Sequence, residues 1–98
     1  MFSDSCLLAD TIRYSITDLG TLGGSGPVVA QGINDSGQVV GTSYTASGFF
    51  HAFLWQSGSG MQDLGALGGG NSQANGINDG GQVVGTSSTA SGFFHAFL

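Results

Sequence analysis

The sequence predicts an all-β fold built from two four-stranded antiparallel units of the kind that form the blades of a β-propeller. Residues 32–54 return almost unchanged as residues 76–98. The offset of 44 to 45 residues is the length of one supersecondary unit, so the chain contains two repeats of that unit. Glycine occupies 19 of the 98 positions, and helix is disfavoured because each interior glycine costs about 1 kcal/mol relative to alanine.

Each repeat contains four short β-rich segments bounded by turn residues, which predict strands. In the first repeat the predicted strands are residues 14–19, 28–33, 38–43 and 49–56. In the second repeat they are residues 61–64, 73–77, 82–87 and 93–98. The predicted organisation is an N-terminal tail (1–13), a first blade (14–60) and a second blade (61–98). The second blade stops one residue before the counterpart of Trp55, so we expect a piece of a longer chain.

The second and third predicted strands of each repeat are joined by a tight turn. The turn reads Asn34-Asp35-Ser-Gly in the first repeat and Asn78-Asp79-Gly-Gly in the second. Asparagine, aspartate and glycine supply the positive φ values and side-chain-to-backbone bonds that a hairpin needs. A calcium loop is the alternative, but the run of alternating acids and the terminal glutamate of such loops are missing.

The last predicted strand of each repeat is apolar on both faces. In the first repeat one face carries Phe49, His51, Phe53 and Trp55, and the other carries Phe50, Ala52 and Leu54. Such a strand cannot have one side in water, which favours a propeller blade packed between neighbours. A β-sandwich is the rival fold. Phe53 and its counterpart Phe97 are predicted core residues, with Ile33 and Val40.

Composition excludes several classes of partner. The net charge is -5, the only basic residue is Arg13, and lysine and glutamate are absent. A chain with no basic cluster is not expected to bind nucleic acid or an anionic membrane surface. No apolar run approaches the roughly 20 residues that span a bilayer. Cys6 stands alone outside the repeats, so no disulfide framework is predicted within the chain and its role stays open.

Three motifs recur together. They are Asp-Leu-Gly-x-Leu-Gly-Gly, Gly-Ile-Asn-Asp-x-Gly-Gln-Val-Val-Gly-x-Ser and His-Ala-Phe-Leu, the last followed by Trp55 in the first repeat. Over residues 14–98 this pattern resembles the HAF-repeat family of probable extracellular bacterial repeat proteins. The resemblance implies a secreted or surface-exposed, propeller-like repeat protein. The chain has fewer repeats than such proteins usually carry, and residues 1–10 do not form a signal peptide.

The repeated polar residues are interpreted as structural. Two histidines and one cysteine are too few for a zinc site, so a ring nitrogen of His51 or His95 is expected to bond a backbone carbonyl. Asp18 and Asp63 are expected to accept backbone N–H bonds at a strand end. The repeat-defining structural residues are therefore Asp18, Asn34, Asp35, His51, Phe53, Asp63, Asn78, Asp79, His95 and Phe97.

No catalytic residue, cofactor site or metal site is predicted. Residues 41–45 miss the nucleophile elbow because Thr45 replaces its final glycine. Residues 58–63 miss the dinucleotide fingerprint at its last position, and a chain without lysine cannot form a P-loop. A hydrolase or lyase on a propeller scaffold remains a third, weaker hypothesis.

The leading functional hypothesis is a non-enzymatic extracellular repeat module that offers a surface for adhesion or for binding an unknown protein or glycan partner. The alternative is a lectin completed by oligomerisation, in which Trp55, Tyr44 and Phe49 stack on sugar rings. Trp55 and Tyr44 have no counterpart in the second repeat, whereas a lectin tends to repeat its site. Two blades expose apolar flanks, so self-association or further repeats of a longer chain are expected.

Overall fold

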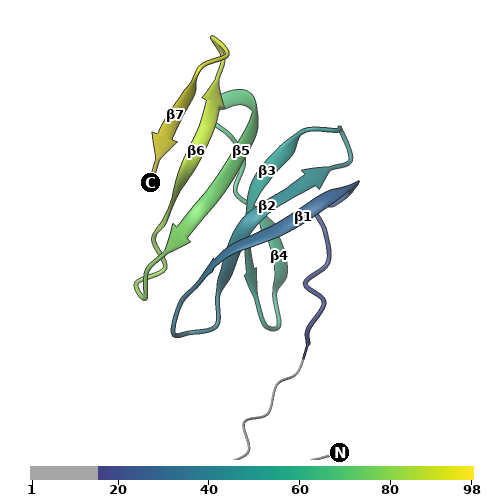
Figure 1. Cartoon of the computed structure of the whole chain (residues 1–98), viewed down its shortest axis with the longest axis vertical. Helices are drawn as coiled ribbons and strands as arrows, with labels where there is room; N and C mark the ends of the chain where they lie inside the picture. Colours follow the sequence, from purple (N-terminus) through teal and green to yellow (C-terminus); the bar gives the residue numbers. More distant parts are fainter. Residues whose placement is uncertain (1–15) are drawn as a thin grey trace, which may run out of the picture.

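The structure is a computed structural model that describes residues 16–98. Within that range it contains seven β-strands in two antiparallel sheets and no helix. The first sheet comprises β1 (Gly23–Ile33), β2 (Val39–Thr45), β3 (Phe50–Gln56) and β4 (Gly60–Asp63). The second sheet comprises β5 (Gly68–Ile77), β6 (Val83–Thr89) and β7 (Phe94–Phe97). The predicted all-β character is thus confirmed for the described residues (Figure 1).

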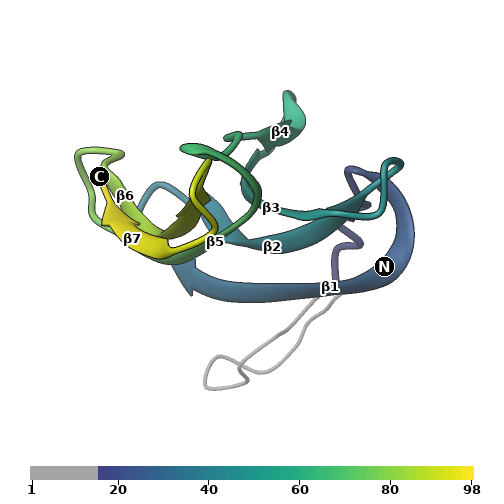
Figure 2. The same ribbon diagram turned by 90° about the horizontal axis from the view of Figure 1, so that it is seen from above.

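The two sheets lie next to each other, and β5 forms the contact between them. β5 packs against β3 and β2 and also touches β1 (Figure 1). Seen from above, the second sheet curves away from the first, with β7 on its far side (Figure 2). Each sheet follows the chain order of its strands, so every hydrogen-bonded neighbour is joined by a short turn.

The first three strands of both sheets have the same register. Ala30 pairs with Gly41 in the first sheet, and Ala74 pairs with Gly85 in the second, each next to a break in the ladder. A side chain cannot fit there, because a Cβ on Gly41 would lie 2.0 Å from the Val29 carbonyl oxygen. The same 2.0 Å approach recurs at Gly85, which explains why glycine stands at this position in both repeats.

The predicted strand assignment is wrong for the first strand of each repeat. Residues 61–64, predicted as the first strand of the second repeat, contribute to β4, which pairs with β3 of the first sheet. The reason is local: a three-residue turn after β3 returns the chain directly onto that strand, with Gly58 at a φ of 89°. The second sheet therefore has three strands.

The predicted strand at residues 14–19 is also absent where it can be inspected. Residues 16–19 belong to no strand, and residues 14 and 15 lie outside the described range, as do the tail at 1–13 and Cys6. The first strand of the sheet is instead the glycine-rich β1, which begins at Gly23.

The Asn-Asp turns form as predicted. Gly37 N–H donates to the Asn34 carbonyl at 3.1 Å, and Gln38 N–H donates to Asn34 Oδ1 at 2.9 Å. Asn78 makes the same pair of bonds in the second sheet. Gly37 adopts a φ of 80°, the positive value for which the glycine was inferred.

The core between the sheets contains the fully buried residues Val40, Ala52 and Ala74. Phe53 is also fully buried but lies outside this cluster. Ala52 and Phe53 are neighbours on β3 and point to opposite faces, so that strand is covered on both sides, as predicted. Ile33 is a wrong prediction: it is 68% exposed. Its counterpart Ile77 faces the first sheet and packs on the core, whereas no described sheet lies before β1.

Candidate functional site

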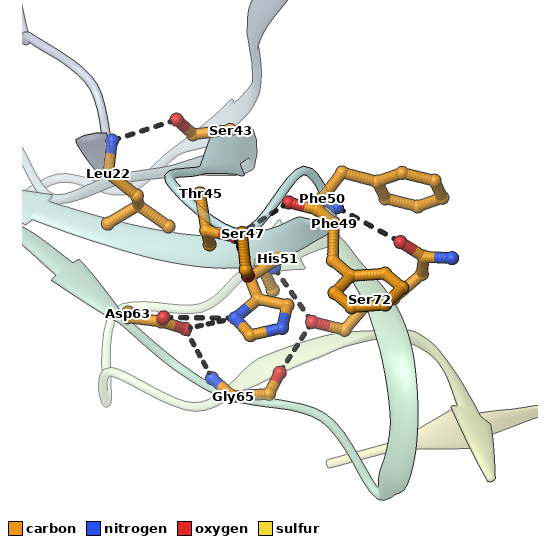
Figure 3. Close-up of polar contacts among 12 residues, drawn as sticks. Leu22, Ser43, Thr45, Ser47, Phe49, Phe50, His51, Asp63, Gly65 and Ser72 are labelled. Atoms are coloured by element: carbon orange, nitrogen blue, oxygen red, sulfur yellow. Dashed lines mark hydrogen bonds and ion pairs between the residues drawn. The ribbon is translucent and has the colours of Figure 1, made fainter. Parts of the chain in front are cut away.

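The densest polar cluster lies where β5 crosses the edge of β3, and His51 is at its centre (Figure 3). His51 Nδ1 lies 2.9 Å from both carboxylate oxygens of Asp63. Nε2 donates to the Gly70 carbonyl oxygen at 3.0 Å. The bond from a histidine nitrogen to a backbone carbonyl, which the sequence predicted, is therefore present at His51. It joins the first sheet to β5 of the second.

Asp63 ends β4 and has two roles. Its Oδ1 accepts the N–H of Gly65 at 2.7 Å, which fixes the turn that leads to β5. The same carboxylate holds the His51 ring. The first role was predicted from the Asp-Leu-Gly motif. The second was not, because Asp63 was assigned to a different blade from His51.

Two side chains of β5 satisfy the outward-facing N–H groups of β3. Ser72 Oγ accepts the N–H of Ala52 at 2.8 Å, and Asn71 Oδ1 accepts the N–H of Phe50 at 3.0 Å. Ser72 is fully buried and donates its own proton to the Gly65 carbonyl. β4 pairs only with the later part of β3, from Phe53 onwards, so these two donors would otherwise be unpaired at the sheet junction. Sequence reasoning missed both residues, which the first repeat replaces with Pro27 and Val28.

Ser72, His51 and Asp63 have the composition of a hydrolase triad, but their hydrogen bonds differ from those of a triad. A nucleophilic serine must donate to the free ring nitrogen of the histidine. Here Nε2 faces the Gly70 carbonyl, and the Ser72 hydroxyl faces the Gly65 carbonyl. The serine is also fully buried. The arrangement binds sheet to sheet and offers no activated nucleophile.

The two Asn-Asp turns also bond to each other. Asn34 Nδ2 donates to the Asn78 carbonyl at 3.0 Å, and Asp35 N–H donates to Asp79 Oδ1 at 2.9 Å. These bonds join residues 44 positions apart, which is the repeat offset itself. The turns therefore form a ladder from one sheet to the next, a role that a turn motif in a single repeat does not reveal.

The residues equivalent to His51, Asp63 and Phe53 lack the contacts between sheets that this cluster makes in the described part of the chain. His95 is exposed, and no side-chain hydrogen bond joins its ring to the described residues. Asp18 is exposed and accepts the N–H of Gly20 at 3.0 Å, as Asp63 does for Gly65. Phe97 is only partly covered, whereas Phe53 is fully buried.

The three aromatic residues predicted to contact a ligand do not converge. Tyr44 and Phe50 pair across β2 and β3, with ring centroids 5.8 Å apart. Phe49 lies against Gly70. Trp55 pairs with Val39 at the opposite end of β3. A surface groove at Tyr44 is lined by Pro27, Val29, Gln31, Thr42, Tyr44, Phe50 and Gln73.

Sequence reasoning missed Phe50, Gln31 and Gln73 as neighbours of Tyr44. The hairpin register between β2 and β3 would have placed Phe50 opposite Tyr44. Gln31 comes from β1 of the same sheet. Gln73 comes from β5, so its approach depends on how the sheets pack, which the sequence does not specify.

Residues 16–98 contain no group of three or more histidine, cysteine, aspartate or glutamate side chains placed to hold a metal ion. The described part of the chain also has no helix that is long and apolar enough to cross a membrane. Comparisons with protein-family models, with curated proteins and with solved structures gave no match. Function is therefore inferred from the chain's own residues.

Proposed function

We propose that the chain is a two-repeat member of the HAF-repeat family and works as a non-enzymatic extracellular repeat module. In this proposal its sheets are propeller-type blades that stack flank to flank and present their outer surface to a protein or glycan partner. The observation that carries the proposal is the use of the repeated polar residues. His51, Asp63 and Asn34 all form bonds that hold one repeat to the next.

The sheet topology supports the propeller interpretation. Each blade of a propeller is a four-stranded antiparallel meander, and it packs against the next blade along the chain. The contact of β5 with β2 and β3 has this form. In a β-sandwich every strand of one sheet would lie over the other sheet, with inward-facing residues on all of them.

Charge and composition favour a neutral or cationic partner over an anionic one. The chain carries a net charge of -5, and its single basic residue lies before the repeats. Nucleic acid and anionic lipid surfaces are repelled by such a chain. Adhesion to a protein or a glycan through the exposed turns is compatible with this charge.

Location provides the direct test. An antibody against the chain, applied to intact producing cells and to their medium, is expected to give signal before lysis. A cytoplasmic protein detected in parallel should appear only after lysis. Signal from the chain that likewise appears only after lysis would contradict the extracellular role.

The lectin alternative has one structural observation in its favour. The groove at Tyr44 combines two aromatic rings with the amides of Gln31 and Gln73. An aromatic surface with a few placed polar groups suits a sugar ring. The second repeat has Ser88 where the first has Tyr44, so the groove occurs once in the chain.

A glycan array separates the two proposals. The repeat-module proposal predicts no glycan signal that depends on Tyr44. The lectin alternative predicts a signal that Tyr44→Ser abolishes, since this change gives the first repeat the residue of the second. Phe93→Ala is the matched control, because Phe93 is an aromatic side chain that is 71% exposed outside the groove.

A further inference from the structure

The outer edge of β7, which no described strand pairs with, is equivalent to the edge of β3 that β4 and β5 cover in the first sheet. Ala52 and Phe53 on β3 are fully buried. Their counterparts on β7 are Ala96, which is exposed, and Phe97, which is partly exposed. Phe94 is also 51% exposed. The structure of the first sheet therefore defines what kind of segment fits beside β7: an Asp-Leu-Gly strand followed by a glycine-rich strand.

The chain carries a second such segment. Residues 16–19 read Ile-Thr-Asp-Leu and align with residues 61–64, which read Met-Gln-Asp-Leu and include most of β4. Residues 16–19 belong to no strand, and Ile16 is 100% exposed. β7 and this segment lie on opposite sides of the molecule in both views (Figures 1 and 2). One chain thus has a strand edge and a matching strand that it does not join.

We propose that a second copy of this chain covers β7, head to tail. Its residues 16–19 pair with β7 as β4 pairs with β3, and its β1 covers β6 and β7 as β5 covers β2 and β3. This inference rests on the blade stacking of the proposed function. It names the partner as a second copy of the chain because the covering residues in the first sheet have their counterparts at the other end of the same molecule.

The pairing of β4 with β3 in the first sheet predicts the register of the contact between the two chains. Phe53 lies opposite Asp63, and Leu64 N–H donates to the Ala52 carbonyl at 2.9 Å. The equivalent pairing sets Phe97 opposite Asp18 of the second copy, with Leu19 N–H of that copy donating to the Ala96 carbonyl. The exposed ring of His95 then meets the Asp18 carboxylate, as His51 meets Asp63.

The turn ladder extends the same contact. Asn34 Nδ2 bonds both Gln38 Oε1 and the Asn78 carbonyl. Asn78 Nδ2 bonds Gln82 Oε1 alone among the described residues. Its second N–H therefore stands where it can donate to the Asn34 carbonyl of the second copy.

Two positions make the contact between chains weaker than the contact within one chain. Asn71 and Ser72 accept two N–H groups of β3. β1 has Pro27 and Val28 at these positions, and neither side chain can accept a hydrogen bond. Association is therefore reversible, and because the contact is heterologous it closes into a ring or extends as an open chain.

Sedimentation over a concentration series of the full chain tests the proposal. The mass is expected to rise above the 9.8 kDa of one chain as concentration increases. Asp18→Arg and Ala96→Arg should each abolish this rise, because the first sets an arginine against His95 and the second puts an arginine at the counterpart of the fully buried Ala52. Ser57→Arg, on the exposed turn after β3, is the control and should associate as the unchanged chain does. Circular dichroism checks that each variant is folded, and Asp18→Asn and His95→Gln replace any arginine variant that is not.

Mixing the two arginine variants tests the direction of the contact. The Asp18→Arg chain keeps a native β7 edge, and the Ala96→Arg chain keeps a native Asp18 segment. Their mixture should form a species of twice the 9.8 kDa mass and stop there, because the remaining ends set arginine against arginine. A mixture that stays monomeric contradicts a head-to-tail contact.

A gain of association tests the role of β1. Replacing Pro27→Asn together with Val28→Ser installs both missing acceptors and should tighten association by about tenfold or more, as two added hydrogen bonds would. A chain that is monomeric at every concentration, or arginine variants that associate as the control does, would overturn the proposal. Neither result bears on extracellular location, which the antibody experiment tests separately.

Discussion

Ala52 and Ala96 belong to the same His-Ala-Phe tripeptide in nearly identical repeats, yet Ala52 is fully buried and Ala96 is exposed. Val40 and Val84 differ in the same way, at 0% and 48% exposure. Their strands have the same register, so local structure does not account for the difference. The first sheet is covered by β4 and β5, and the second sheet has no such cover among the described residues. Burial in this chain is therefore a property of neighbouring sheets, as in other repeat proteins.

The hydrogen bonds of polar groups also depend on whether a neighbouring sheet is present. The N–H of Ala52 is bonded to Ser72 of the next sheet, and both nitrogens of His51 have oxygen partners. His95 has the same sequence neighbours and lacks these partners within the described chain. The repeated residues thus acquire their bonds between sheets only where a further sheet is docked.

The largest difference between the repeats is expected at the two phenylalanines. Phe53→Ala should lower the free energy of unfolding by about 3–5 kcal/mol, the usual cost of emptying a fully buried phenylalanine site. Phe97→Ala should cost less than half as much, because its side chain is partly exposed. Urea unfolding of the dilute chain measures both. Equal losses would mean that the pairing of β4 with β3, which has no counterpart beside β7 among the described residues, does not decide burial.

Gly41 and Gly85, which lie next to the breaks in the two ladders, are expected to lose equal stability on substitution. Gly41→Ala and Gly85→Ala should each destabilise by about 1–3 kcal/mol, because a Cβ has no room beside the neighbouring carbonyl. This contact lies within one sheet in both repeats. A clear inequality in urea midpoints, with unchanged slopes, would show that the sheets differ internally as well as in their cover.

Val40→Ala and Val84→Ala test how cover by a neighbouring sheet affects the stability contributed by an aliphatic side chain. Removing two methyl groups from the buried Val40 should cost about 1.5–2 kcal/mol. The same change at the half-exposed Val84 should stay within about 0.5 kcal/mol, as surface substitutions usually do. Thermal unfolding monitored at low concentration is sufficient to rank them, and a Val84 variant as unstable as the Val40 variant would contradict the account.

The smallest expected effect concerns the histidines. His51→Gln should cost about 1 kcal/mol through its lost bonds to Asp63 and Gly70. His95→Gln should have no measurable effect on the dilute monomer. Should both variants unfold alike, the His51 bonds contribute nothing to the contact between the sheets.

Much of the fold was predictable because its determinants are local. The Asn34 and Asn78 turns, the strands that follow them and the two covered faces of β3 were all read from short motifs. The position of β4 was not, because Asp63 belongs to the second repeat in sequence and to the first sheet in space. The sequence repeat and the structural unit therefore begin at different residues.

The site was predictable only in part for the same reason. A carbonyl partner for His51 follows from the chemistry of a half-buried histidine. Its identity, Gly70, depends on the approach of β5, and so do the contacts of Ser72 and of the groove at Tyr44. Ile33 was expected in the core from its sequence pattern, but its burial requires a sheet before β1.

Amide hydrogen exchange at Ala52 and Ala96 tests the central claim most directly. In dilute solution the Ala52 N–H, bonded to Ser72 Oγ in the core, should exchange at least about tenfold more slowly than the Ala96 N–H. The two amides share flanking residues, so their intrinsic exchange rates match. Slow exchange at Ala52 with fast exchange at Ala96 is the predicted result. Equal exchange rates at the two alanines would contradict the claim that the docked sheet buries the repeat.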